Sequence, residues 1–475
     1  MLRVYNTLSN RKEEFMPDSG KIRMYVCGPT VYDLSHLGHA RSAVAFDVIY
    51  RYLKYRGYEV FYTRNYTDID DKIINRANKE GVSSQEIAER YIKAFDEDME
   101  GLGVEVPTYR PKATETIHEI VGVIQALLDK DCAYIIDGDV YYSVRKFDGY
   151  GRLSGKNIEE LEAGARVEVD ERKRDPLDFA LWKAGKHGEP WWESPWGRGR
   201  PGWHIECSAM SRKFLGETID IHGGGRDLIF PHHENEIAQS EAATGKPFVR
   251  YWLHNGFVNI QKEKMSKSLG NILNIRDILH ACPAEAVRLF LLSSHYRSPI
   301  DYSPEVPKEA NAALERFYAT LERIERYLIS VEVKGVSAGH SLRDKFETDM
   351  DDDFNSASVI GSVFNAIKEA NRMLDDADSW KSDPKKNASL LSGFREDFRT
   401  IGSVLGVFNK GSATYLEEKK RGISILPEEI EGFIRERNEA RSKGDWEKAD
   451  KIRIDLGERG IALEDYTGGT RWKVR

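Results

Sequence analysis

The apolar pattern of the N-terminal part of the chain changes its period twice. A short apolar run over residues 22–27 stops at Gly28-Pro29, and a second run, YEVFYTRNYTD, follows Gly57; both are typical of buried strands. Between them, apolar residues recur every three or four positions and predict one face of a helix, with Ser35 as its N-cap. That face consists of Ala45, Val48, Ile49, Tyr52 and Leu53. The order strand, helix, strand predicts a parallel sheet.

Helical periodicity dominates the second half of the chain. One amphipathic stretch begins after Pro304, and another follows the Gly/Ser-containing linker VEVKGVSAGHS. Their apolar faces comprise Leu314, Phe317, Leu321, Ile324 and Leu328 in the first, and Ile360, Phe364, Ile367 and Leu374 in the second. Beyond FNKGSATYLEEKKRG, charges alternate in sign along a last short region. We therefore expect a helical domain from about Pro304 and a small C-terminal unit, whereas AYIIDGDVYYSV further upstream predicts short strands.

Composition limits the class of protein. A chain of 475 residues is too long for one ordinary core, so three or four folding units are expected. A formal charge of −8 argues against histone-like binding of nucleic acid by charge alone. No apolar run approaches the roughly 20 residues that cross a bilayer, and the N-terminus has no apolar signal region, so we expect a cytoplasmic protein without a membrane partner. The cysteines Cys27, Cys132, Cys207 and Cys282 are widely spaced, which favours reduced thiols or metal ligands over disulfides.

Two short motifs suit the binding of phosphate groups. In HLGH, His36 and His39 fall at the start of the first predicted helix, where unpaired N–H groups and the helix dipole favour an anion; a pair of helix-capping histidines is the alternative. In EKMSKSLGN, Lys264 and Lys267 lie in a loop that can bring two ammonium groups onto phosphate oxygens, although a lone K-x-x-K is usually a solvated face. Neither GxGxxG nor a P-loop is present at the first turn, and GRLSGKN at Gly151 is only a near match.

The stretch PGWHIECSAMSRKFLGETIDIHGGGRDLIFPHHENEIAQSEA gathers thiol, imidazole and carboxylate groups. With Pro231 in the first turn of a helix, His232 and Glu236 lie at i and i+4 on one face and can reach one metal ion. Cys207 and Cys27 both fall near the ends of predicted strands, where a parallel sheet collects its ligands. Such a set suits Zn²⁺, although a small buried apolar side chain is the alternative role for each cysteine. The spacing of HHENEI fits neither HExxH nor HxxEH, which argues against a zinc protease.

Together, HLGH and KMSKS resemble the HIGH and KMSKS signatures of class I aminoacyl-tRNA synthetases. The resemblance narrows with MYVCGPTVYDLSHLGH, YTRNYTDIDDKII, GRPGWHIECSAM, DIHGGGRDLIFPHHENEIAQSEA and KMSKSLGN, which in this order resemble the cysteinyl-tRNA synthetase family. It continues to the C-terminal GIALEDYTGGTRW. The HIGH motif carries Leu37 in place of Ile, a change that keeps the size of the side chain.

The resemblance implies a fold and a division into domains. We expect an α/β protein in which a Rossmann-like parallel-sheet catalytic domain is split by an α+β insertion and is followed by a helical bundle domain and a small C-terminal mixed α/β unit. The expected limits are 1–115 for the first half of the catalytic domain, 116–200 for the connective insertion, 201–303 for the second half with the KMSKS loop, 304–408 for the helical tRNA-binding domain, and 409–475 for the anticodon-binding unit.

The resemblance also implies the reaction and its residues. ATP, with Mg²⁺, would convert L-cysteine to cysteinyl-adenylate and pyrophosphate, and the cysteine would pass to the 3'-terminal adenosine of tRNA-Cys on a monomeric enzyme. The implied site residues are His36, His39, Lys264 and Lys267 for catalysis and ATP binding; Gly223, Gly224, Gly225 and Asp227 for ATP; Thr67 and Trp203 for cysteine; and Cys27, Cys207, His232 and Glu236 for one Zn²⁺, with His233 and Glu234 as neighbours only.

Zinc would solve a problem of selectivity. Serine differs from cysteine by one atom, and an apolar pocket separates near-isosteres by only about 1–3 kcal/mol. A thiol that coordinates zinc loses its proton, whereas a hydroxyl is a poorer acid and ligand, so no editing domain is required. Two alternatives stay open. An ATP-dependent cysteine ligase of the mycothiol type would not need the domains after Pro304, and a non-enzymatic RNA-binding relative would be expected to lose HxGH or the KMSKS lysines, both of which are present.

Overall fold

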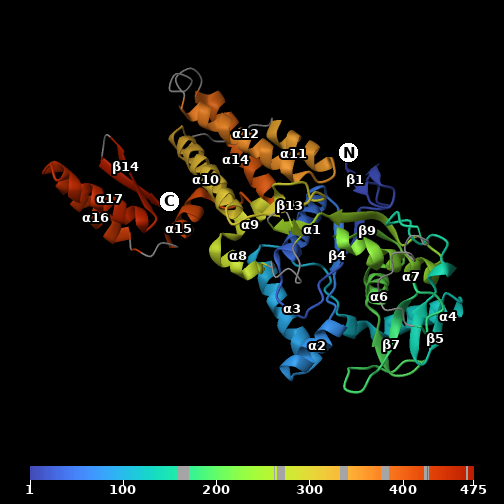
Figure 1. Ribbon diagram of the computed structural model, residues 1–475. Helices are drawn as coiled ribbons and strands as arrows, with labels where there is room; N and C mark the ends of the chain where they lie inside the picture. The colour runs from blue at the N-terminus through green and yellow to red at the C-terminus, as the bar shows by residue number, and fades with distance from the viewer. Residues whose placement is uncertain are drawn as a thin grey trace.

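A four-stranded parallel sheet forms the centre of the computed structural model (Figure 1), with the strand order β10-β9-β3-β4. These strands are β3 (Lys21–Val26), β4 (Glu59–Arg64), β9 (Ile219–Gly225) and β10 (Val249–Asn255). Two segments far apart in the sequence therefore build one sheet. The structure describes residues 1–157, 171–260, 263–264, 273–331, 341–375, 384–421, 425, 427–466 and 469–474.

Helix α1 (Leu37–Tyr55) connects β3 to β4 and packs against the sheet. Its predicted apolar face is buried, and Gly57, with φ of +88°, adopts the left-handed conformation that ends the helical run at low cost. Since β3 and β4 pair in parallel, the predicted strand–helix–strand unit is confirmed.

The N-cap of α1 is His36, not Ser35 as the pattern predicted. The His36 Nδ1 accepts the N–H of Gly38 at 3.2 Å, and the His39 Nδ1 accepts the N–H of His36 at 3.2 Å, so the two imidazoles satisfy donors at the helix start. Ser35 is buried, and its carbonyl accepts the N–H of Ile275. The HLGH motif is therefore a capping device as well as a candidate phosphate site.

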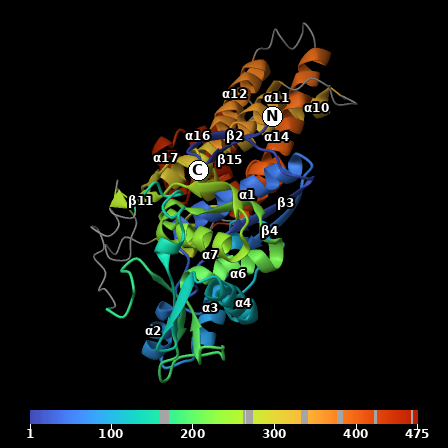
Figure 2. The same ribbon diagram turned by 90° about the vertical axis from the view of Figure 1, so that its right-hand side faces the viewer.

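An antiparallel sheet with the order β5-β6-β7-β8 lies between the two parts of the parallel sheet in the sequence. It is covered by α4 and α6, with which it shares a second apolar core. The bounds are α4 (Ile117–Asp129), β5 (Ala133–Ile136), β6 (Asp139–Tyr142), β7 (Phe179–Ala184), β8 (Gly199–Pro201) and α6 (Trp203–Leu215). The helical bundle and this insertion lie at opposite ends of the molecule (Figure 2).

The helical bundle packs directly on α1, so that the sheet, α1 and the bundle share one apolar core. Both predicted amphipathic faces fall on its helices, and most of their residues are buried. The bundle consists of α10 (Val306–Ser330), α11 (Ser341–Asp351), α12 (Ser356–Asp375), α14 (Pro384–Leu405) and α15 (Ser412–Arg421). Because this core is continuous, the bundle is not an independent attachment to the sheet domain.

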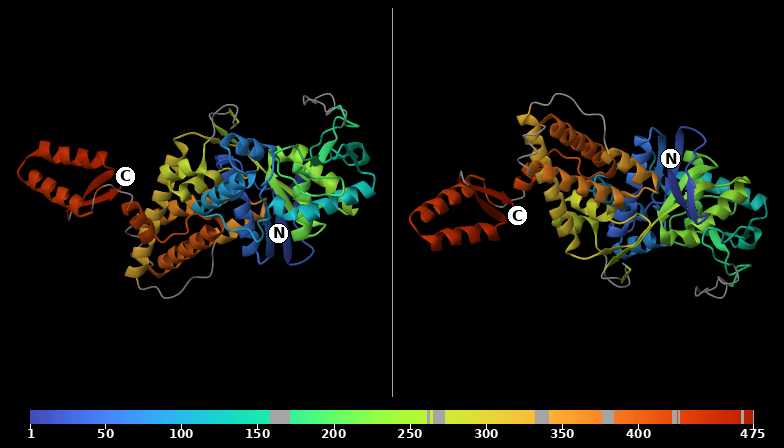
Figure 3. Two further views of the ribbon diagram at one scale, coloured as in Figure 1. Left: turned by 90° about the horizontal axis from the view of Figure 1, so that it is seen from below. Right: turned by 90° about the horizontal axis from the view of Figure 1, so that it is seen from above.

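The C-terminal unit has its own small core and projects away from the rest of the chain (Figure 3). It is formed by α16 (Pro427–Ser442), α17 (Trp446–Glu458), β14 (Ile461–Tyr466) and β15 (Gly469–Val474). The predicted fold class is thus confirmed: a parallel sheet domain with an antiparallel insertion, a helical domain and a mixed C-terminal unit. Within the described residues, no helix combines the length and apolar character that a membrane crossing requires.

The remaining elements connect these parts. They are β1 (Arg3–Asn6), β2 (Arg11–Glu14), α2 (Asp71–Glu80), α3 (Ser84–Gly101), η1 (Ala113–Thr116), η2 (Val144–Lys146), η3 (Arg226–Leu228), η4 (Ile229–His233), α7 (Glu234–Thr244), β11 (Val258–Ile260), β12 (Glu263–Lys264), α8 (Ile275–Ala281), α9 (Ala284–Leu292) and β13 (Ile300–Tyr302).

Candidate active site

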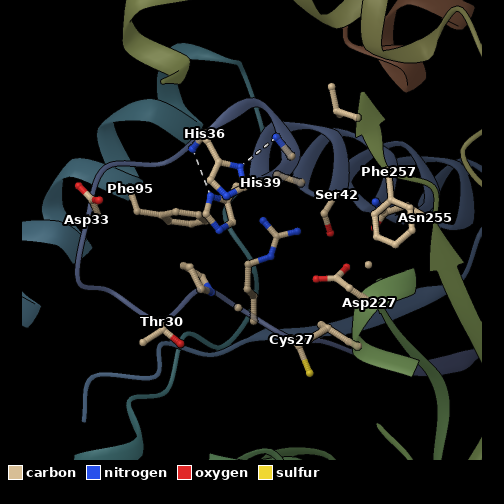
Figure 4. Close-up of a pocket in the computed structure, with 18 of the residues that line it drawn as sticks. Cys27, Thr30, Asp33, His36, His39, Ser42, Phe95, Asp227, Asn255 and Phe257 are labelled. Atoms are coloured by element: carbon tan, nitrogen blue, oxygen red, sulfur yellow. Dashed lines mark hydrogen bonds between the residues drawn. The ribbon is translucent and has the colours of Figure 1, made fainter. Parts of the chain in front are cut away.

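A cavity of about 390 Å³ opens at the carboxyl ends of β3, β9 and β10, next to the N-terminus of α1 (Figure 4). This edge of a parallel sheet is where ligands of α/β proteins bind, because strand ends and helix N-termini converge there. The near wall is formed by His36, His39 and Ser42 of α1, and the far wall by residues 255–258 after β10. Cys27, Trp203 and Asp227 are among the residues that line the cavity between the walls.

The two histidines of the near wall have a defined chemistry. Their rings stack with centroids 3.9 Å apart and planes at 24°. Since the Nδ1 atoms of His36 and His39 both accept backbone N–H groups, a neutral ring carries its proton on Nε2. Two imidazoles with Nε2–H donors at a helix N-terminus match the oxygens of a phosphate group.

A second group of side chains meets below the cavity. The Sγ atoms of Cys27 and Cys207 are 3.7 Å apart, the Cys27 Sγ is 3.5 Å from the Glu236 Oε1, and the His232 Nε2 is 3.1 Å from the same oxygen. All four donor atoms lie within 4.8 Å of one another, and the side chains of Cys207, His232 and Glu236 are buried. The sequence-predicted metal set is therefore brought together.

The spacing of these donors fits zinc. Tetrahedral bonds of about 2.3 Å to sulfur and 2.0–2.1 Å to nitrogen or oxygen place two sulfurs roughly 3.7–3.8 Å apart, a sulfur and an oxygen about 3.5–3.6 Å apart, and a nitrogen and an oxygen about 3.3 Å apart. The measured separations are 3.7, 3.5 and 3.1 Å. These three separations in the set Cys27, Cys207, His232 and Glu236 differ from those around one such ion by about 0.2 Å or less.

Cys207 reaches this point from a helix. It lies in α6, which begins at Trp203, directly after the edge strand β8, so its expected place near a strand end is wrong. The error is local: the mixed aromatic, apolar and polar residues after Gly202, WHIECSAM, do not by themselves distinguish a strand end from a helix start. Cys27, in contrast, follows β3 as expected.

The buried charges of this group balance one another. Burial by itself would raise the pKa of Glu236, but the imidazoles of His222 and His232 lower that pKa to about 2. Burial would lower the pKa of His232, yet Glu236 and Cys207 raise it to about 10. The hydrogen bond from the Cys27 thiol lowers the pKa of Cys207 to about 6, whereas burial and the same bond raise the pKa of Cys27. The protonated His232 supplies the positive charge next to the Cys207 thiolate and the Glu236 carboxylate, and a bound metal ion would supply that charge in place of the proton.

A second overlapping set, with His222 and His233 beside Cys27 and Glu236, lies within the same distance limit. The His233 Nε2 is 3.4 Å from the Cys27 Sγ but 4.0 Å from the Glu236 Oε1, which is longer than the roughly 3.3 Å of a shared tetrahedral ion. The His222 Nε2 is 2.9 Å from the Glu236 Oε2, a hydrogen-bond distance. Geometry thus favours His232 over both other histidines.

Sequence reasoning predicted His233 as a neighbour of this set and assigned no role to His204, His222 or His254. The His233 Nδ1 faces the His254 Nε2 at 2.8 Å, and the His204 Nδ1 faces the His232 Nδ1 at 2.9 Å. The signal for His204 and His233 was the number of histidines in one short stretch; His254 lies outside that stretch, in β10. In each of these pairs one histidine, His232 or His233, belongs to η4, the single turn before α7. The backbone of Phe230 in this turn departs from helical geometry.

The predicted nucleotide glycines divide into two roles. A Cβ on Gly223 would lie 2.3 Å from two ring atoms of Phe46, so close packing favours glycine at this position, whereas one on Gly224 would lie 2.8 Å from the terminal methyl of Leu228, a contact that a shift of that side chain can relieve. Gly225 and Asp227 line the cavity. Packing against Phe46 supports the steric alternative for Gly223, and the nucleotide role stays a prediction for all three glycines and for Asp227.

The two predicted cysteine-binding residues also differ. Trp203 lines the cavity, is 38% exposed, and stacks on His232 with centroids 4.2 Å apart and planes at 23°. Thr67 is buried, its hydroxyl donates to the Glu206 carboxylate at 2.9 Å, and its backbone pairs with the segment that follows Cys27. Trp203 is therefore placed to meet a ligand, and Thr67 braces the wall behind it.

The predicted KMSKS lysines lie at the limit of the described residues. β12 ends at Lys264, whose side chain is outside the described part, as is Lys267. The strand that leads to them, β11, begins at Val258 of the far wall. Their roles stay predictions.

Three protein families match successive parts of the chain. The family described as "tRNA synthetases class I (C) catalytic domain" matches residues 14–312, the "DALR domain" matches residues 345–409, and the "Cysteinyl-tRNA ligase anticodon binding domain" matches residues 425–472. A cysteine–tRNA ligase of Thermodesulfovibrio yellowstonii is 57% identical over 489 residues, and one of Geobacter metallireducens is 55% identical over 487 residues, each with 100% of both chains covered.

Solved structures support the fold alone. Methionyl-tRNA synthetase of Mycobacterium tuberculosis, in complex with methionyl-adenylate, has a TM-score of 0.62 at 16% sequence identity and covers 84% of this chain and 94% of its own. A putative arginyl-tRNA synthetase of Campylobacter jejuni has a TM-score of 0.58 at 12% identity and covers 82% of this chain and 93% of its own. At such identities the likeness concerns the arrangement of elements and not the substrate.

Proposed function

The chain belongs to the cysteine–tRNA ligase family of class I aminoacyl-tRNA synthetases, and from this premise we propose how its cavity and metal pocket perform the reaction. The enzyme is a cysteine–tRNA ligase whose substrates are L-cysteine, ATP and tRNA-Cys. ATP activates the cysteine carboxylate to cysteinyl-adenylate with release of pyrophosphate, and the cysteinyl group then passes to the 3'-terminal adenosine of the tRNA.

The observation that carries the proposal is the convergence of Cys27, Cys207, His232 and Glu236 at tetrahedral spacing beside the cavity. Bound there, zinc supplies affinity for sulfur over oxygen and acidity toward a thiol, which separates cysteine from serine in one binding step. Cys27 lines the cavity as well as the metal pocket, so the side chain of a bound substrate is directed to that point.

Other residues orient the amino acid. Trp203 stacks on the His232 ring and holds it in place. Trp203 also lines the cavity, where its indole restricts the space around the substrate side chain. Asp227, at the cavity edge, is placed to accept hydrogen bonds from the substrate ammonium or a ribose hydroxyl. With its side chain next to Trp203 and its ammonium at Asp227, the bound cysteine directs its carboxylate toward the near wall.

The near wall acts on phosphate. His36 and His39 donate from Nε2 to the α-phosphate oxygens, where negative charge accumulates as the carboxylate attacks, while Lys264 and Lys267 receive the departing pyrophosphate with Mg²⁺. The position of β11 supports these separate roles of the histidines and the lysines. β11 begins at Val258 in the far wall of the cavity and leads to the segment that bears the lysines.

The helical bundle and the C-terminal unit bind tRNA-Cys. The proposal rests on the matches of these parts to the DALR and anticodon-binding families. The projecting C-terminal unit suits contact with a distant part of a long substrate (Figure 3). The proposed domain limits are those expected from the sequence, with transitions after residues 115, 200, 303 and 408, and the enzyme acts as a monomer.

Three measurements test the proposal. Purified enzyme should catalyse cysteine-dependent ATP–pyrophosphate exchange and charge tRNA-Cys, and metal analysis should give one zinc per chain. Exchange without transfer to tRNA would instead favour a cysteine ligase of the mycothiol type, and absence of both activities would favour a non-enzymatic RNA-binding relative. The similarity to cysteine–tRNA ligases over 100% of the chain speaks against both.

A further inference from the structure

Arg41 of α1 is a buried arginine surrounded by backbone carbonyls. It is 1% exposed, and its Nη1 donates to the carbonyl of Leu291. Its Nη2 lies 2.7 Å from the carbonyl oxygen of His295, 3.3 Å from that of Ser294 and 3.4 Å from that of Ser298. The ion pairs of the described residues do not include Arg41, and burial lowers its pKa to about 10, at which it still carries its charge at neutral pH. Burial of a cation is costly, so other groups of the protein must compensate the charge of Arg41.

The end of helix α9 supplies the compensating charge. Leu291 belongs to the last turn of α9, where carbonyls have no partner within the helix and the helix dipole is negative. Arg41 therefore caps α9 and, through the other carbonyls, holds residues 293–298, which we call the backing turn. One side chain thus ties α1 to the segment that follows α9.

The backing turn supports the far wall of the cavity. The Gly256 N–H donates to the Tyr296 carbonyl at 2.8 Å, and the Ile300 N–H donates to the Phe257 carbonyl at 2.9 Å. A Cβ on Gly256 would lie 2.2 Å from the carbonyl oxygen of Ser298, so the wall and the turn are in backbone contact. A displacement of the backing turn must therefore move the far wall.

The near wall belongs to the helix that carries Arg41. His39 precedes Arg41 by two positions and Ser42 follows it directly, and Figure 4 shows His39 on the opposite side of the cavity from Asn255 and Phe257. We propose that Arg41 is a positioning residue that fixes the separation of the two cavity walls for ATP. The inference rests on the proposed function, since it requires that this cavity receive the nucleotide.

The cysteine end of the site does not depend on this tie. Cys207 and Trp203 lie on α6, and His232 and Glu236 lie at η4 and α7, whereas the hydrogen bonds of the Arg41 guanidinium among the described residues go to the carbonyls of Leu291, Ser294, His295 and Ser298. Loss of the tie should therefore weaken ATP binding and leave cysteine and zinc binding unchanged. A merely structural role would disturb both ends.

The test compares Arg41→Met and Arg41→Lys with the wild type. Lys54→Met is the matched control, because Lys54 is a half-exposed cation of the same helix, paired with Glu105. KM for ATP and for cysteine are measured by pyrophosphate exchange, zinc by metal analysis, and binding of a non-hydrolysable ATP analogue directly. Arg41→Met should raise KM for ATP at least tenfold, with KM for cysteine and zinc content within twofold. Arg41→Lys should give about a threefold rise, because one ammonium can still donate to part of the carbonyl set.

Parallel rises in both KM values, or a lower kcat with KM for ATP within twofold of the wild type, would overturn the inference. If Arg41→Met does not fold, an unchanged KM for ATP in Arg41→Lys overturns it. The direct binding assay separates this failure from failure of the proposed function. A wild type that does not bind the ATP analogue removes both proposals, whereas equal binding by wild type and Arg41→Met removes only the role of Arg41.

Discussion

Replacing His232 by alanine should empty the metal pocket, whereas replacing the adjacent His233 should not. The His232 Nε2 is 3.1 Å from the Glu236 Oε1 and fits a shared ion, but the His233 Nε2 is 4.0 Å from that oxygen. Structural zinc sites bind with about 10–16 kcal/mol, so an equal share for each of four ligands is about 2.5–4 kcal/mol. His232→Ala should therefore bind zinc roughly 10²–10³-fold more weakly.

A third variant, His222→Ala, should show an intermediate loss of zinc affinity. His222 is hydrogen-bonded to the Glu236 Oε2 at 2.9 Å and orients this ligand without reaching the ion itself. Loss of such a supporting contact typically lowers metal affinity about 10–100-fold, so His222→Ala should fall between His233→Ala and His232→Ala. The order of the three variants, more than any single value, reports which histidine is the ligand.

The assay is competition for zinc with a chelating dye, after purification in the absence of added metal, with circular dichroism as the check on folding. Zinc per chain and the preference for cysteine over serine in pyrophosphate exchange are measured on the same samples. If His232→Ala keeps an affinity within tenfold of the wild type, or if His233→Ala loses as much as His232→Ala, the assignment of the ligand set is refuted. Undiminished preference for cysteine in a zinc-free enzyme would refute the role of the metal.

Three further predictions follow from other parts of the structure. Removing a phosphate donor by His39→Ala or Lys267→Ala should lower the exchange rate a hundredfold or more, because one such donor contributes about 2.7–4 kcal/mol; a change below threefold would exclude the role. A chain that ends at residue 421 should keep exchange within twofold and lose at least tenfold in kcat/KM for tRNA, since the C-terminal unit has its own core; full charging would contradict its part in tRNA binding. Arg288→Met should lower the free energy of unfolding by about 3–5 kcal/mol in urea titration, because it leaves the buried Asp47 without the guanidinium 2.6 Å away; a loss below 1 kcal/mol would show that the remaining partners of Asp47 suffice.

The contacts of Arg288 also indicate where the chain can be truncated. Arg288 joins α9 to Asp47 of α1 and also donates to the carbonyl of Leu405 at the end of α14. Removal of everything after residue 303 would expose the core that α1 shares with the bundle. A cut before the C-terminal unit is therefore the cleaner separation of activation from tRNA binding.

Local features were determined by the sequence alone. The spacing of apolar residues defined α1, α10 and α12, because the period of a helix is a property of the backbone and does not depend on neighbours. The same periodicity placed His232 and Glu236 together, and the sequence of motifs was sufficient to find the family. Family resemblance also supplied the two cysteines, which no spacing connected.

Tertiary structure decided everything that depends on distant segments. Cys27 and Cys207 are 180 positions apart, and only the pairing of β3 with β9 and the placement of α6 bring their sulfurs to 3.7 Å. The roles of Gly223 and Arg41 likewise became visible only with the ring of Phe46 and the carbonyls after α9 in place. Sequence period records which face of an element is apolar; it does not record which distant element covers that face, because many packings satisfy the same pattern and the whole chain selects among them.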